Sequence, residues 1–244
     1  MRLSVCVVAR NHGPLLPSLF RNVEDVAWEI VLVDGGSSDG TEEIARSHPL
    51  VRYHLEPWRG SITRQKNKAL DLARGDWALI LDCDERLSPD LKAALPGLMR
   101  SFRVRYYKFP RYNLVSLDPH RHVEGKSLYP DFQFRMLRLP TRLRYMESSP
   151  VHQTFQDPAG PGVPFGGIRK KLFMAKPRGL HIFHYDFYLH DREAREKKVE
   201  FFESLDPSAG LRRVYLYEDR PHRVVDTPPP WPSPEEEPRM EGAP

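Results

Sequence analysis

The first hundred residues alternate short apolar runs with amphipathic segments, and this alternation limits the fold more than any other feature of the sequence. Apolar runs typical of buried strands occupy residues 3–9, 29–34, 51–55 and 77–82. Helical spacing of apolar residues is found around residues 14–24, 41–47, 61–74 and 89–101. Strands that alternate with helices favour a mainly parallel sheet flanked by helices, so we predict an α/β fold.

The pattern changes after residue 101. Residues 102–226 are rich in Arg, Tyr and Pro, with short strand-like pieces and one late helical segment, DREAREKKVEFFESL. We therefore interpret residues 1–226 as one domain with two parts, 1–101 and 102–226. The remaining residues, 227–244, hold 7 of the 24 prolines and four Glu against one Arg, so we expect a disordered or polyproline-like tail.

Composition restricts the compartment. At 244 residues and 40% hydrophobic content, the chain can bury a substantial core. Its two cysteines, Cys6 and Cys83, lie inside separate apolar runs, which argues against a disulfide and favours a reducing compartment. The N-terminal apolar run is too short for a signal peptide or a membrane span, so we expect a cytoplasmic protein.

The formal net charge of +4 is unevenly distributed. Basic residues interleave with aromatic ones between about residues 103 and 178, as in RVRYYKFPRYN and RMLRLPTRLRY. This mixture suits nucleic acid, anionic lipid or phosphorylated small ligands, although solvated strand faces have the same composition. We expect no nucleic acid partner, and we keep open a peripheral contact with the cytoplasmic face of the inner membrane.

Polar residues stand at the carboxyl ends of three predicted strands. The first exit is Ala9, Arg10 and Asn11, the second is Asp34 with Gly36 in the turn after it, and the third is Asp82 and Asp84, so each exit brings at least one polar side chain. Ligands of open parallel sheets bind at this edge, so we expect the site there. Asp82, Asp84 and Glu85 would repel one another unless a cation lay among them.

Three segments, in this order, carry a family resemblance: SVCVVARN, EIVLVDGGSSDGTEEIAR and RQKNKALDLARGDWALILDCDERLSPDL. They resemble the successive motifs of glycosyltransferase family 2, the nucleotide-sugar-dependent enzymes of the GT-A fold. Within that family, the segments YPDFQFRMLR and HIFHYDF resemble those of the bacterial branch that acts in lipopolysaccharide-core and cell-surface glycan assembly. The resemblance implies a Rossmann-like nucleotide-binding half, residues 1–101, and an acceptor-binding half, residues 102–226.

The resemblance further implies a donor site for a nucleoside-diphosphate sugar, usually a UDP-sugar. Asp82 and Asp84 match the DXD motif, in which the first acid faces the ribose and the second binds Mn²⁺ or Mg²⁺ on the diphosphate. The exit of the first strand, Ala9 to Asn11, would border the base through backbone groups, and Asp34 would accept a hydrogen bond from the base. The nucleotide-binding residues expected on this basis are Ala9, Arg10, Asn11, Asp34, Gly36, Arg64, Lys66 and Asp82.

The metal site and the general base lead to separate predictions. Either His184 or His181 could complete a metal site with Asp84, and we select His184 as the second ligand. Inverting transfer to a glycan or lipid-linked acceptor needs a base, for which Asp131 is the first candidate and Glu85 the second. Many relatives have His-Glu where this chain has His152 and Gln153, and Gln153 cannot accept a proton. Residues 157–167, DPAGPGVPFGG, are the candidate for a loop that closes over the sugar.

Two other functions stay open from the sequence. Nucleotidyl transfer to a sugar phosphate would use a related α/β core, but it calls for a glycine-rich basic loop after the first strand. That loop here, ARNHGPLLP, has one glycine. A catalytically inactive module that binds a nucleotide sugar or RNA is the other alternative, and the acidic DXD pocket argues against RNA at that position.

Overall fold

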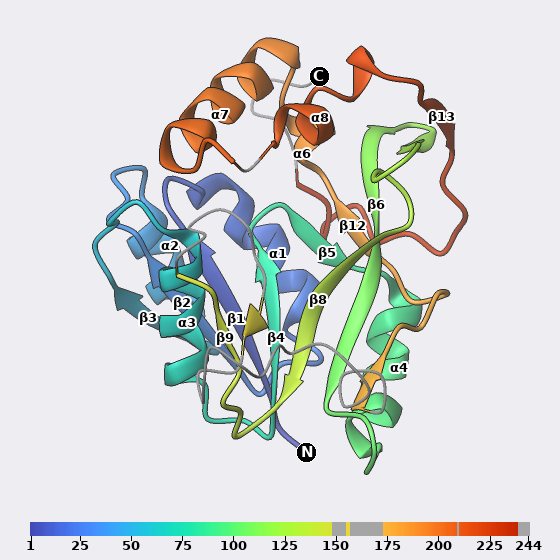
Figure 1. Ribbon diagram of the computed structural model, residues 1–244. Helices are drawn as coiled ribbons and strands as arrows, with labels where there is room; N and C mark the ends of the chain where they lie inside the picture. Colours follow the sequence, from blue (N-terminus) through green and yellow to red (C-terminus); the bar gives the residue numbers. More distant parts are fainter. Residues whose placement is uncertain (148–154, 157–172, 209, 239–244) are drawn as a thin grey trace.

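The computed structural model of the chain describes residues 1–147, 155–156, 173–208 and 210–238 (Figure 1). The strands of the first half are β1 (Leu3–Ala9), β2 (Glu29–Asp34), β3 (Val51–Leu55), β4 (Trp77–Asp82) and β5 (Glu85–Leu87). The helices of this half are η1 (Gly13–Leu15), α1 (Leu16–Val23), α2 (Thr41–Ser47), α3 (Ile62–Leu72) and α4 (Pro89–Arg100).

The second half has short strands around two long ones, β6 and β8, and one long helix, α7. Its strands are β6 (Tyr106–Leu117), β7 (His120–Glu124), β8 (Asp131–Arg138), β9 (Arg144–Tyr145), β10 (Phe155–Gln156), β11 (Met174–Ala175), β12 (Ile182–His184) and β13 (Arg223–Asp226). Its helices are α6 (Asp186–Leu189), α7 (Arg192–Leu205), α8 (Arg212–Tyr215) and the 3-10 helix η2 (Tyr217–Asp219).

One mixed sheet joins the two halves in the order β13-β7-β6-β8-β4-β1-β2-β3. Strands β3, β2, β1 and β4 run parallel, while β8 pairs antiparallel with β4 and β6 pairs antiparallel with β8. The predicted α/β class and the parallel arrangement of the first four strands are confirmed. The second half extends the same sheet, so β4 and β8 lie side by side at its centre.

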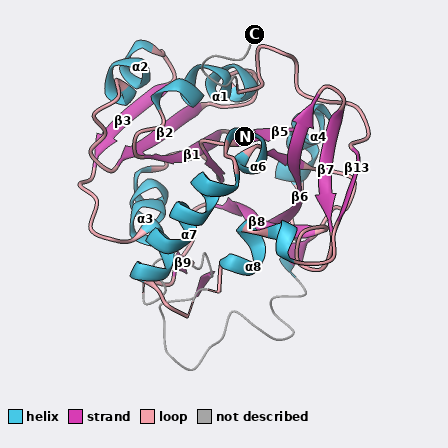
Figure 2. Cartoon of the chain, turned by 90° about the horizontal axis from the view of Figure 1, so that it is seen from above, coloured by secondary structure: helices cyan, strands magenta, loops and turns pink. Residues whose placement is uncertain are grey.

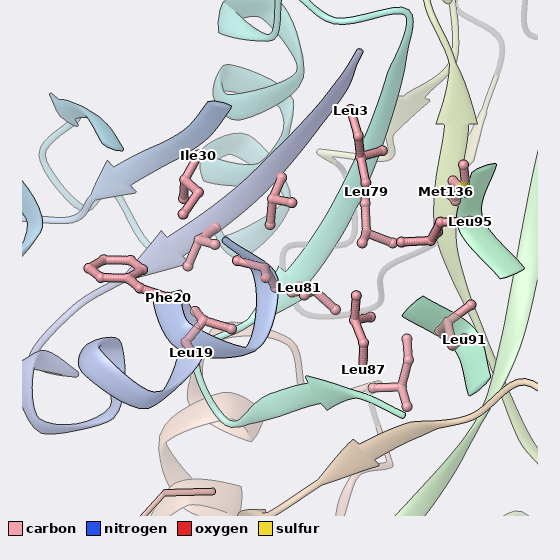
Figure 3. Packing of buried hydrophobic residues seen from close by; sticks show 14 of the residues in the cluster. Leu3, Leu19, Phe20, Ile30, Leu79, Leu81, Leu87, Leu91, Leu95 and Met136 are labelled. Carbon is pink, nitrogen blue, oxygen red and sulfur yellow. The ribbon is translucent and has the colours of Figure 1, made fainter. Parts of the chain in front are cut away.

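The apolar runs form strands because both of their faces are covered. Leu3, Leu79 and Leu81 pack on one face against α1 and α4, with Leu19 and Leu91 among their neighbours (Figure 3). The alternate residues of the same strands form a second cluster on the opposite face, where α3 packs. Continuous apolar runs are therefore needed, as expected for buried parallel strands.

Local signals at the helix starts explain where two of these helices begin. Ser61 caps α3 by accepting a hydrogen bond from the backbone N–H of Arg64. Ser88 caps α4 in the same way through Leu91, with Pro89 at the first helical position, where its missing N–H costs nothing.

Helices α7 and α8 lie above the carboxyl ends of the parallel strands (Figures 1 and 2). In the view from above, α7 runs between β1 and α3, and α8 lies close to β8. None of the helices in the described part of the chain has the length and apolarity needed to cross a bilayer.

The tail expectation is wrong for residues 227–238, which pack along the domain. Thr227 is buried, and the Trp231 ring stacks on His120 with ring centroids 4.4 Å apart. Glu236 forms an ion pair with Lys92 at 2.7 Å. The acidic run that indicated disorder instead finds basic partners on the body of the protein, a complementarity that composition alone does not reveal.

Candidate active site

A cleft of about 740 Å³ opens at the carboxyl ends of β1 and β4, below α7 and α8. Its floor and walls include Ala9, Arg10, Asn11, His12, Gly35, Trp58, Gln65, Asp82, Asp84, Asp131, Gln133 and His184. Its roof includes Lys198, Phe201, Phe202, Leu211, Val214 and Tyr215. The cleft therefore lies at the edge of the sheet where the sequence predicted the site.

The exits of β1 and β2 are held together by hydrogen bonds. The backbone N–H of Asn11 donates to Ser37 Oγ (2.8 Å), and that of Ser38 donates to Asn11 Oδ1 (2.9 Å). Asn11 has φ of 56°, a left-handed conformation that asparagine tolerates better than most residues. The backbone from Ala9 to Asn11 is consequently fixed at the cleft wall.

Asp34 lies below the turn that follows β2 and is buried. Its carboxylate accepts hydrogen bonds from Tyr53 Oη (2.8 Å) and from Ser37 Oγ (2.6 Å). The backbone N–H of Gly36, at φ of 91°, also donates to it (3.2 Å). Asp34 thus organises the turn, while its neighbour Gly35 lines the cleft.

An aromatic wall stands beside this turn. The backbone N–H of Trp58 donates to Gly35 O (2.9 Å), which fixes Trp58 next to the β2 exit. The Arg10 guanidinium carbon lies 5.6 Å from the centre of the Trp58 ring. A flat ring and a planar cation at one wall suit a stacked nucleobase.

Six charged side chains form a chain of ion pairs in and beneath the floor of the cleft, which we call the floor network: Lys66, Asp82, Arg135, Glu85, Arg111 and Asp131. Lys66 Nζ lies 2.5 Å from Asp82 Oδ1, and Arg135 Nη2 lies 2.6 Å from Asp82 Oδ2. The same Arg135 nitrogen lies 2.5 Å from Glu85 Oε1. Positive and negative groups alternate along it, which allows them to be buried together.

The floor network sets the state of Asp82. Burial alone would raise the pKa of Asp82, but Arg135 and Lys66 outweigh burial and hold it below its usual value. The fully buried Lys66 was predicted to lie near the phosphates, and its ammonium instead bonds to Asp82. Arg64, predicted beside it, pairs with Glu56 at 3.3 Å.

Asp84 and His184 face each other across the cleft floor, with His184 Nε2 3.5 Å from Asp84 Oδ2. Asn113 Nδ2 donates to Leu128 O (3.0 Å), which directs Asn113 Oδ1 toward His184 Nδ1 at 2.7 Å. His184 Nδ1 therefore carries the donated proton. His184 Nε2, the other ring nitrogen, faces the Asp84 carboxylate, so a ring nitrogen and a carboxylate oxygen meet at the cleft floor.

The electrostatics around Asp84 favour its charged form. Burial opposes ionisation, but His184 and Lys198 outweigh burial and hold the pKa of Asp84 well below its usual value. Burial raises the pKa of the adjacent Cys83 thiol, whose Sγ donates to Val8 O (3.3 Å). Cys83 is thus a neutral thiol that donates a hydrogen bond to the backbone and does not supply a thiolate ligand.

The two candidate bases occupy different positions. Asp131 lines the cleft, where Arg111 donates to its Oδ2 (2.6 Å) and Gln133 to its Oδ1 (2.6 Å). Burial would raise the pKa of Asp131, but Arg111 outweighs burial and lowers it. Glu85 lies beneath the floor, fully buried, and accepts from Arg135 and Arg111.

As far as the described residues define the lining, the cleft includes only part of the predicted set. The lining contains Ala9, Arg10, Asn11, Asp82, Asp84, Asp131 and His184. Outside it are Asp34, Gly36, Arg64, Lys66 and Glu85, of which Asp34, Lys66 and Glu85 are buried in support of lining residues. The predictions for Gln153 and for the loop at 157–167 concern positions outside the described residues.

Sequence reasoning missed Arg111, Arg135 and Lys198. Asp131, Gln133 and Arg135 recur at alternate positions, a spacing that places polar side chains on one face of a strand and could have revealed Arg135. Lys198 lies three positions after the buried Arg195 and four positions before Phe202. Helical spacing therefore puts Lys198 on the same face of the helix as these residues, and Lys197 on another face. We find no comparable signal for Arg111.

The mixed sheet flanked by helices, with the cleft at the carboxyl ends of its parallel strands, defines an α/β protein of the GT-A fold. Residues 4–174 match the sequence profile of Glycosyl transferase family 2, which covers most of the chain. The chain belongs to glycosyltransferase family 2, so the predicted family and the GT-A fold are confirmed.

Relatives with names agree with this family. The chain is 37% identical over 102 residues to the Rhizobium meliloti lipopolysaccharide core biosynthesis glycosyltransferase LpsC, covering 40% of this chain and 37% of that one. It is 24% identical over 182 residues to the uncharacterized glycosyltransferase RC0292 of Rickettsia conorii, covering 74% and 62%. The chain thus spans less than two thirds of the length of these relatives.

Two solved structures share the fold. The mannosyltransferase PcManGT of Pyrobaculum calidifontis, in complex with GDP-Man and Mn²⁺, superimposes with a TM-score of 0.54 at 15% identity. That match covers 81% of this chain and 60% of the other. TarS residues 1–349 of S. aureus superimpose with a TM-score of 0.51 at 14% identity, covering 90% and 77%.

Proposed function

We propose that this protein transfers a sugar from a nucleoside-diphosphate sugar to a hydroxyl group of an acceptor, with a divalent metal ion held by Asp84 and His184. The observation that carries the proposal is the convergence of two atoms that can ligate a metal, His184 Nε2 and Asp84 Oδ2, which lie 3.5 Å apart at the floor of the cleft. Both atoms could coordinate one divalent cation, and Asn113 orients the imidazole from behind.

The two proposed metal ligands, Asp84 and His184, are compatible with Mn²⁺ or Mg²⁺. The described residues contain no cluster of three or more His, Cys, Asp or Glu side chains suited to a metal. A pair of protein ligands is compatible with an ion that arrives with its substrate and takes its remaining ligands from phosphate oxygens. When bound, the ion would stabilise negative charge that develops on the diphosphate.

Other cleft residues take roles around that centre. Arg10 and Trp58 provide the wall for the base, and Asp82, fixed by Lys66 and Arg135, faces the ribose. Asp131 is the general base, because its carboxylate lines the cleft where an acceptor hydroxyl would bind and is ionised beside Arg111. We propose inversion, a UDP-linked donor and a glycan or lipid-linked acceptor for cell-surface polysaccharide as in the related bacterial branch.

Calorimetry of nucleotide binding tests the proposal. We expect UDP, or GDP, CDP or dTDP if the base differs, to bind wild-type protein more tightly with Mn²⁺ than without it. Asp84→Ala should abolish the Mn²⁺ effect, whereas Asp71→Ala, an exposed acid outside the cleft, should leave it unchanged. Binding that ignores Mn²⁺, or that survives Asp84→Ala, would contradict the metal site. Positive binding would justify assays of sugar-donor hydrolysis and transfer.

A further inference from the structure

The roof of the cleft brings a second cation toward the proposed metal site. Lys198 projects from α7 into the cleft lining, and its ammonium donates to Asp186 Oδ1. Asp186 is fully buried at the start of α6, two residues after His184. Lys198 is therefore held in place from behind by a buried carboxylate.

The backbone fixes this pair beside Asp84. The N–H of Tyr185 donates to Asp84 O (2.9 Å), so the strand that carries His184 and the loop that carries Asp84 are joined directly. Asp186 follows Tyr185 in the chain, and Lys198 lines the same cleft as Asp84 and His184. A diphosphate on the metal would lie between the floor and this lysine.

Charge balance explains why a second cation is needed there. A nucleoside-diphosphate sugar carries about two negative charges, and the free diphosphate carries about three at neutral pH, because a terminal phosphate has a second pKa of about 6. A divalent ion compensates two of these charges. The third appears on the β-phosphate only as the sugar leaves, so a fixed cation nearby would favour the products and the transition state over the bound donor.

We propose that Lys198 donates a hydrogen bond to the β-phosphate and stabilises the leaving diphosphate, an inference that rests on the proposed function. In this step the bond between the anomeric carbon and the β-phosphate oxygen breaks, and its electron pair stays on that oxygen. A bond forms from the acceptor oxygen to the anomeric carbon, and the acceptor proton passes to Asp131. Lys198 keeps its proton throughout, and its three N–H groups can serve Asp186 and a phosphate oxygen together.

Replacing Lys198 alone would leave the buried Asp186 carboxylate without its ammonium partner and with the His190 imidazole beside it, which threatens folding. The main test is therefore the double variant Lys198→Gln with Asp186→Asn, which removes both charges and keeps a hydrogen bond possible. Lys198→Arg retains the cation. Lys197→Gln is the matched control, because Lys197 is the next residue on α7, 72% exposed and paired only with Glu193 among the ion pairs of the described residues.

The measurement is the ratio of UDP to UMP affinity by calorimetry with saturating Mn²⁺, using GDP and GMP instead if guanine is preferred. We expect the ratio of UDP to UMP affinity to fall about tenfold in the double variant. The affinity for UMP should change little, because UMP lacks the β-phosphate. Lys198→Arg and Lys197→Gln should retain the preference.

The outcomes separate the two proposals. An unchanged ratio in a double variant that still binds nucleotide would overturn the role of Lys198 and leave the transferase proposal intact. An equal loss of UMP and UDP affinity would likewise overturn it, since that result indicates damage to the whole cleft. Absence of nucleotide binding in the wild type would overturn both.

Discussion

Replacing Arg135 with methionine tests the floor network, and its cost can be worked from the geometry. Arg135 bridges Asp82 and Glu85 at 2.6 and 2.5 Å, and its side chain is almost completely buried. Without it, the network keeps three carboxylates and two cations, Lys66 and Arg111. Removing one partner of a buried ion pair typically costs about 3–5 kcal/mol, a large fraction of the roughly 5–15 kcal/mol that stabilises a domain.

The assay is urea denaturation at neutral pH, followed by circular dichroism. We expect Arg135→Met to lower the free energy of unfolding by about 3–5 kcal/mol. The double variant Arg135→Met with Glu85→Gln restores the charge balance and should recover a substantial part of the loss.

An exposed pair of similar length is the control for this experiment. Lys197 Nζ lies 2.7 Å from Glu193 Oε1, but both side chains are about three quarters exposed. Lys197→Met should therefore change stability by less than about 0.5 kcal/mol. A loss below about 1 kcal/mol in Arg135→Met, or a double variant no more stable than the single one, would refute the reasoning that burial makes this network energetically important.

Three further expectations follow from the site and its supports. Trp58→Ala should weaken nucleotide binding by about tenfold, measured by calorimetry, because a stacking partner is lost, and an unchanged affinity would remove Trp58 from the base site. The pKa of His190 is raised by its hydrogen bond to Asp186, so this stabilisation is full below the unfolded pKa and disappears as pH rises through the folded value. His190→Gln should thus lower Tm more at about pH 6 than at about pH 9, and an equal effect at both would contradict the linkage. Deleting residues 227–238 with all that follows should lower Tm, because the buried Arg86 donates to the Glu236 carbonyl (2.7 Å), and an unchanged Tm would show that these contacts add no stability.

The outline of the first half was predictable because its signals are local. An apolar run that must be buried on both faces reads as a parallel strand from its own residues, and the structure has β1 to β4 with the predicted bounds. Parallel strands share one carboxyl edge, so the polar exits at Arg10, Asp82 and Asp84 were expected together before any contact was known.

Supporting roles could not be assigned from sequence in the same way. Asp34, Lys66 and Glu85 each lie in a segment that resembles a family motif. In the structure all three are buried beneath or beside the cleft lining, where they bond to other side chains. Sequence spacing tells that such residues are near the site. It does not tell whether a side chain points into the cleft or away from it, because that depends on elements far along the chain.

The sequence alone determined the α/β class, the edge of the sheet that carries the site, and the acids at that edge, since two- and 3.6-residue periodicities report burial locally. Only the tertiary structure decided which charges meet. Arg111 and Arg135 reach the floor from β6 and β8, Lys198 reaches the roof from α7, and the tail finds Lys92. A charged residue in sequence is ordinarily read as solvated, and its burial becomes favourable only when folding brings an opposite charge to it from a distant segment.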